Sequence, residues 1–156
     1  MPIYMQIIIN IVFSYVASVG FALTINVPHR ALNLAGVSGT VGWMVCWFIT
    51  KAQMGRMLSN LMGAFVIGIL GLFFARIKKC PVTVFNIPAL VPLVPGVPAY
   101  QAVRALVNGN VFDAEASFLR VGIVTCSIAL GILLATMFTE MFYRVKKFYK
   151  KRKIKL

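Results

Sequence analysis

Acidic residues are almost missing from this 156-residue chain, which has 3 Asp and Glu against 16 Lys and Arg, and a single His. Cysteine is scarce too, since Cys46, Cys80 and Cys126 stand alone without C-x-x-C spacing. An odd number of isolated cysteines predicts neither a disulfide framework nor a metal site. The sequence also has no Gly-rich phosphate loop and no nucleophile-and-base set. We therefore expect no enzyme activity, no metal and no cofactor.

Charge of either sign is sparse, at 12% of residues, whereas 60% are hydrophobic and the mean hydropathy is +0.89. A domain of this size buries only about two thirds of the surface that its unfolded chain exposes. So much apolar side chain would leave large apolar patches in water. The composition therefore excludes an ordinary soluble domain and favours a protein dissolved in lipid.

Five stretches of the sequence contain no charged residue, and each is close to the roughly 20 residues that a membrane-spanning helix needs. They are 2–27, 31–50, 57–75, 80–103 and 121–139. Four of them have no internal proline and are rich in Ile, Leu, Val, Phe, Ala and Gly. We expect an all-α integral membrane protein with five transmembrane segments.

The fourth stretch is interrupted by five prolines, which are Pro81, Pro88, Pro92, Pro95 and Pro98. Each interior proline removes an amide donor and clashes with the preceding turn, so this segment cannot form one regular helix. We expect a break at Pro95-Gly96 and a helix that restarts near Pro98, because proline suits the first turn.

Irregular backbone at membrane depth is tolerated where it lines a cavity or is buried in protein. In transporters, such breaks commonly form the solute site. The break therefore predicts a substrate path for a small carboxylate-bearing solute, with charge from Arg104 or from freed amides. Its candidate residues are Asn86, Pro88, Pro92, Pro95, Gly96, Tyr100, Gln101 and Arg104, with Asn26 from the turn before Pro28. The alternative is that the prolines only kink a packed helix.

The basic residues predict the topology, since Lys and Arg of short loops stay on the cytoplasmic side. Eight of the 16 lie between Arg144 and Lys155. With five crossings and this end inside, Arg30, Arg76, Lys78 and Lys79 join them, which makes twelve inside and at most four outside. Four crossings would instead place Arg30, Arg76, Lys78 and Lys79 outside. We expect an N-out, C-in protein.

The division that follows is a polytopic membrane domain at residues 1–143 and a basic cytoplasmic tail at 144–156. Directly after a span, such a tail is attracted to anionic lipid, at about 1 kcal/mol per basic residue near the surface. We expect anionic lipid, and no nucleic acid, as its partner. Self-association into a homo-oligomer stays open.

Small residues recur at intervals that let helix backbones approach closely. The positions are Ala35, Ser38, Gly39, Gly42, Ala64, Gly68, Ser127, Gly131 and Ala135. This pattern predicts a compact helix bundle or a helical partner, and says nothing of activity.

Two motifs carry a resemblance that covers nearly the whole chain. They are PALVPLVPG at residues 88–96, followed by Tyr100, and the turn NVP at residues 26–28, followed by Arg30. In these motifs, in length and in five-span layout, the sequence resembles the threonine/serine exporter family (ThrE-like). It resembles the family's C-terminal half, which in many bacteria is a separate small membrane protein of the YjjB type. The basic tail departs from the family pattern.

The resemblance implies a subunit of a bipartite secondary exporter in the bacterial cytoplasmic (inner) membrane, working with a larger YjjP-type membrane subunit. Fused members are similar to exporters of threonine and serine, whereas split pairs are associated with succinate, a dicarboxylate. An ion gradient, expected to be of protons, would drive export. The alternative is a non-transporting membrane scaffold that stabilises a partner protein.

Overall fold

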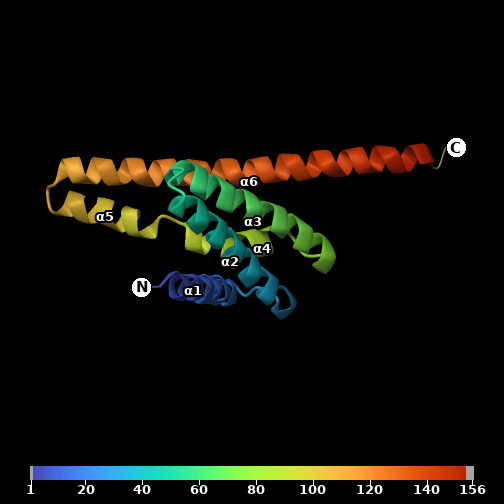
Figure 1. Ribbon diagram of the computed structural model, residues 1–156, viewed down its shortest axis with the longest axis horizontal. Coiled ribbons are helices and arrows are strands. Elements are labelled where there is room, and N and C mark those ends of the chain that lie inside the picture. Colours follow the sequence, from blue (N-terminus) through green and yellow to red (C-terminus); the bar gives the residue numbers. More distant parts are fainter. Residues whose placement is uncertain (1, 154–156) are drawn as a thin grey trace.

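A computed structural model describes residues 2–153, and side chains up to residue 143. These residues form helices only, joined by short turns (Figure 1). In chain order the elements are α1 (Ile3–Thr24), α2 (His29–Lys51), α3 (Arg56–Lys78), α4 (Thr83–Leu90), the 3₁₀ helix η1 (Val91–Leu93), α5 (Gly96–Val107) and α6 (Val111–Lys153). The all-helical prediction is confirmed for this part of the chain.

Four helices, α1, α2, α3 and α6, are each long and apolar enough to cross a membrane. A fifth crossing would have to come from the bent pair Thr83–Leu93 and Gly96–Val107, whose axes differ by 58°. The five-span topology and its orientation stay predictions. The basic tail falls at the end of α6, which is helical to Lys153, but the side chains of residues 144–156 lie outside those described.

Close approach of small residues holds the helices together, as the sequence pattern predicts. All nine small residues named above are buried. A Cβ atom on Gly131 of α6 would lie 2.5 Å from the Leu61 carbonyl oxygen and 2.9 Å from the Ala64 Cβ, both on α3. Large apolar side chains instead cover the outside of α1 and α6. This arrangement is typical of membrane bundles, where lipid solvates the large side chains and small residues form the interfaces.

The contacts fix the direction of each helix. Gly63 of α3 faces Cys46 of α2 and Leu93 of η1, whereas Gly68 of α3 faces Ala135 of α6. Together with the other glycine contacts, this register makes α2 and α4 antiparallel to α3, and α6 parallel to it. Directions that alternate along the chain are what successive membrane crossings require.

The last helix is much longer than the charge-free stretch 121–139 that predicted it. Its apolar part, Val111–Tyr143, has 33 residues. At about 1.5 Å per residue this is about 50 Å, whereas a hydrocarbon core is about 30 Å thick. The stretch ended at Arg120 and Glu140 only because these are charged, and a charged side chain on a helix surface does not end the helix.

Residues 96–122, here called the arm, extend past the end of the bundle that carries the α2–α3 turn (Figure 1). The arm is α5, a short turn and the first part of α6, and α5 packs mainly on α6. The rest of α6 runs beside α3, from Arg56 at the arm end to Arg76, which lies over the Tyr143 ring. The arm therefore stands apart from the other helices.

Candidate functional site

The predicted break lies between η1 and α5. Pro95 has φ −78° and ψ 57°, and the Gly96 amide donates to the Val94 carbonyl at 2.8 Å. These values describe an inverse γ-turn. The helix restarts at Gly96, with Pro98 in its first turn, as the sequence predicts.

The contacts of the break show where it lies along the bundle, whereas its depth in a membrane stays a prediction. Leu93 packs on Gly63, and Pro95 and Gly96 share a cavity with Asn60 and Arg56, the residue that starts α3. The break therefore lies near the arm end of the bundle, within about two helical turns of Arg56. Eleven residues of α4 and η1 are too few to reach further at about 1.5–2 Å each.

A cavity of about 410 Å³, here called the break cavity, is lined by residues 92–98 together with side chains of α2, α3 and α6. Two of these side chains are charged, Arg56 and Arg120, and no acidic residue lines it. Trp43 also lines it, but its Nε1 donates to the Asn10 Oδ1 at 2.8 Å. The charged side chains that line the break cavity are therefore all positive.

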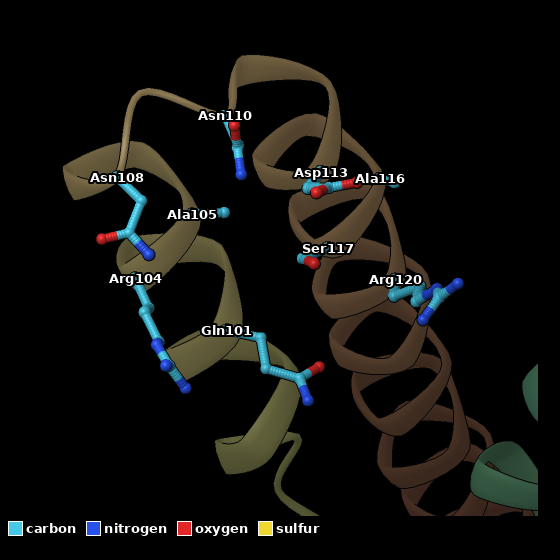
Figure 2. A pocket seen from close by; sticks show the side chains of 9 residues that line it. All are labelled: Gln101, Arg104, Ala105, Asn108, Asn110, Asp113, Ala116, Ser117 and Arg120. Carbon is cyan, nitrogen blue, oxygen red and sulfur yellow. The ribbon is translucent and has the colours of Figure 1, made fainter.

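A second hollow of about 330 Å³ lies in the arm, between α5 and α6, and is here called the arm cleft. Figure 2 shows Gln101 reaching from α5 towards α6, where Asp113 and Ser117 lie. Arg104 runs along α5 in the same view (Figure 2). Arg120 lines both hollows, so the arm cleft and the break cavity are neighbours.

The structure brings most of the predicted site residues to these two hollows. Pro92, Pro95 and Gly96 line the break cavity, and Gln101 and Arg104 line the arm cleft. Tyr100 is 66% exposed on the outside of the arm and lines neither.

The other three predicted residues lie elsewhere. Asn86 and Pro88 are in α4 inside the bundle, and the Asn86 side chain faces Gly71 of α3 with its Oδ1 buried and without a hydrogen-bond partner in the described residues. Asn26 lies in the α1–α2 turn at the opposite end from the arm, with φ 54°. Asn is among the residues that tolerate this left-handed conformation, so its observed role is to end α1.

Arg56, Arg120, Asp113 and Ser117 were not among the predicted site residues. Arg56 and Arg120 are two of the four basic residues that the predicted topology places outside. A signal was nonetheless there, because Gln101 and Arg104, and likewise Asp113, Ser117 and Arg120, recur at three- and four-residue intervals. Such intervals place side chains on one helix face. The sequence alone does not show that α5 packs antiparallel to α6, and this packing brings the polar faces of the two helices together.

Three arginines, Arg56, Arg104 and Arg120, and one acidic residue, Asp113, line the two hollows. No ion pair joins Asp113 to an arginine among the described side chains. Guanidinium groups pair with carboxylates through two parallel hydrogen bonds. The arrangement can therefore hold a small anion.

Comparison with known proteins connects this chain to membrane transport. A family model described as "Threonine/Serine exporter, ThrE" matches residues 10–138. An uncharacterized protein of Haemophilus influenzae is 25% identical over 150 residues, which cover 91% of this chain and 50% of that protein. The chain thus spans about half the length of this curated relative. No solved structure matches. With its long apolar helices, the match indicates a multi-pass membrane protein.

Proposed function

Because the chain belongs to the threonine/serine exporter family, we propose that it is the membrane subunit of a bipartite secondary exporter for small carboxylate-bearing solutes. The observation that carries this proposal is the break cavity, a hollow at a proline-broken helix with two arginines and no acid in its lining. The solute is threonine, serine or a succinate-type dicarboxylate. Its path runs through the break cavity and the arm cleft, which Arg120 joins.

The outer surface of the arm is an argument for a partner protein. Its large apolar side chains do not line the arm cleft, and Val107 is 81% and Phe112 90% exposed, whereas mostly polar side chains line the cleft. In water this distribution would be unfavourable, so lipid or another apolar surface covers the arm. A larger YjjP-type membrane subunit is the proposed cover. The curated relative, twice as long as the matched region, has room for both parts in one chain.

We place the N-terminus and the α5–α6 turn outside and the basic tail inside a bacterial cytoplasmic membrane. The alternating helix directions support five crossings, with α4, η1 and α5 acting as one broken crossing. The few basic residues at the outer end and the many at the other end support this sidedness. An ion gradient, of protons, supplies the energy. Anionic lipid binds the basic tail.

The test is efflux of threonine and of succinate from cells that express the chain with its companion. Gly96→Leu should abolish efflux, because a Cβ at Gly96 meets no atom within 4 Å and the side chain would fill the break cavity. Arg104→Ala should lower efflux by removing charge from the arm cleft. Gly122→Leu is the matched control, since Gly122 is equally open and lines neither hollow.

Wild-type efflux from both variants, at equal protein level, would refute the solute path. The alternative function, a scaffold that only stabilises its partner, predicts that outcome together with loss of the companion protein when this chain is deleted. The exporter predicts loss of efflux even where the companion remains in the membrane at its normal level.

A further inference from the structure

A third hollow, of about 190 Å³, lies between α3 and α6 near the end of the bundle far from the arm. It is here called the aromatic groove, and its lining residues are Ile69, Phe73, Phe138, Thr139, Phe142 and Tyr143. The Thr139 hydroxyl already donates to the Ala135 carbonyl at 2.7 Å. The groove therefore offers an apolar, mostly aromatic surface.

The phenylalanines of the groove face the surroundings of the protein, since Phe73 and Phe138 are each 53% exposed and Phe142 is 62% exposed. From Ile69 to Arg76 the groove follows α3 for seven residues, or about 10 Å. A helix about 10 Å wide fills about 800 Å³ over that length. A partner helix could therefore cover the groove but not fill it, whereas a single hydrocarbon chain can enter.

The groove ends beside a guanidinium group with free donors. Arg76 lies about one turn beyond Phe73 on α3, and its guanidinium carbon is 3.2 Å from the Tyr143 ring centroid. At this distance the planar group lies flat on the ring, so its N–H donors, which lie in its plane, are not used by the ring. No described residue accepts a hydrogen bond from them.

The chain has little negative charge to give this arginine. Of its three acidic residues, two lie in the arm and the third is Glu140 of α6. Glu140 does not line the groove and forms no ion pair with the described side chains. Lys78 and Lys79 follow Arg76, and residues 144–156 add eight basic residues and no acidic one. This end of the groove is therefore suited to an anion from outside the chain.

We propose that the aromatic groove binds one anionic phospholipid, with the phosphate on Arg76 and part of one acyl chain against the phenylalanine rings. Guanidinium groups bind phosphate through parallel hydrogen bonds. Basic pockets between membrane helices are suited to anionic headgroups. This site is separate from the basic tail, whose attraction to lipid needs no groove, and it does not depend on the proposed export.

The experiment counts lipid molecules bound to the full chain by native mass spectrometry, after purification in detergent. The probes are phosphatidylglycerol, phosphatidylcholine and glycerol 3-phosphate at matched concentrations. One phosphatidylglycerol should bind at least about tenfold more tightly than phosphatidylcholine, whose choline cation is repelled by the basic surface. Glycerol 3-phosphate should bind far more weakly, because it has the phosphate but no acyl chain to bury.

Variants test the two parts of the site. Arg76→Gln should weaken phosphatidylglycerol by about tenfold or more, and phosphatidylcholine by less. Arg76→Lys keeps the charge but not the planar donors, so it should recover only part of the loss. Phe142→Ala should weaken both lipids, because it removes one wall of the groove.

Matched controls come from positions outside the groove. Lys51→Gln removes a cation that also lies over a ring, 5.4 Å from the Trp47 centroid, but at the arm end of the bundle. Met137→Ala removes a side chain of α6 that is 62% exposed, as Phe142 is, and does not line the groove. Both variants should bind phosphatidylglycerol as the wild type does.

Equal binding of the two lipids, unchanged in Arg76→Gln, would make the groove ordinary lipid-facing surface and overturn the site. Loss of phosphatidylglycerol when Lys146, Lys147, Lys150 and Lys151 are replaced by Gln, with Arg76→Gln unchanged, would place the lipid on the tail and also overturn it. Binding to the chain alone that disappears in the complex with its companion would show that the companion covers the groove, and would remove lipid as its occupant. Efflux measurements decide the exporter separately, since the lipid site can stand where export fails, and the reverse.

Discussion

Glycine has opposite surroundings in the bundle and in the arm. In the bundle, a Cβ on Gly39, Gly71 or Gly131 would collide with a neighbouring helix. In the arm, a Cβ on Gly96, Gly109 or Gly122 would meet nothing within 4 Å. These three bundle glycines are therefore contact points between helices, although Gly20 of α1 is open, whereas the arm glycines lie at a break, in a turn or on an open helix surface. The two regions also differ in polarity, since the polar side chains of the arm line a cleft whereas those of the bundle are mostly bonded within it.

This contrast separates stability from function. The bundle satisfies its buried groups locally, as when Ser127 donates to the Ile123 carbonyl at 2.6 Å and Ser38 to the Leu34 carbonyl at 2.9 Å. The arm leaves Arg104, Asp113 and Arg120 without ion pairs among the described residues. Substitutions in the bundle should therefore change folding, and substitutions in the arm should change binding and assembly.

The largest effect is expected from Phe112→Asp, at the 90%-exposed tip of the arm. If a companion subunit covers this surface, a buried unpaired charge should reduce co-purification of the companion by more than about tenfold. The melting temperature of the isolated chain in detergent should stay unchanged, because Phe112 packs on little of its own chain. Asp at the comparably exposed Tyr4 of α1, 75% exposed, is the control. Normal co-purification of Phe112→Asp would remove the functional distinction between arm and bundle.

Next is a pair of substitutions on one helix, Gly131→Ala in the bundle and Gly122→Ala at the edge of the arm. The Gly131 methyl meets the Leu61 carbonyl oxygen of α3, so overpacking should cost about 1–3 kcal/mol. The Gly122 methyl meets nothing, and alanine's helix preference should add up to about 1 kcal/mol. Thermal unfolding in detergent measures both. A loss at both positions would mean that the arm is packed as tightly as the bundle.

A smaller effect is expected where the bundle borders the break cavity. The Trp43 indole donates to the Asn10 side chain at 2.8 Å and ties α2 to α1. Trp43→Phe should destabilise the chain by about 0.6–1.7 kcal/mol, the range of hydrogen bonds between membrane helices. A double-mutant cycle with Asn10→Ala isolates the bond. Purely additive effects would show that the hydrogen bond contributes nothing and that packing alone holds α1.

The smallest effect concerns the end of the bundle far from the arm. The Arg76 guanidinium lies 3.2 Å from the Tyr143 ring centroid. Arg76→Gln should cost about 0.5–1 kcal/mol in thermal unfolding, the usual strength of an exposed cation–π contact. Lys78→Gln, in the same last turn of α3, should cost less. Equal losses would indicate that net charge at this end matters, and the ring contact does not.

The sequence predicted the bundle well and the arm poorly. Small residues at regular intervals predicted the buried interfaces, and prolines predicted the break at Pro95, because both signals are local properties of the chain. The arm could not be predicted from charge, because Arg120 ends the charge-free stretch 121–139 but does not end α6. Arg56 and Arg120 lie far apart in the sequence, so no local pattern could place them in one cavity.

By itself the sequence determined the solvent, the helical fold and the place of the break, since hydropathy, small residues and missing amides act on neighbouring residues. Only the tertiary structure decided the position of the break along the bundle and the charge beside it. The reason is that α3, η1 and α6 meet in a register fixed by packing at Gly63 and Gly131, and that register sets which arginines line the cavity at the break.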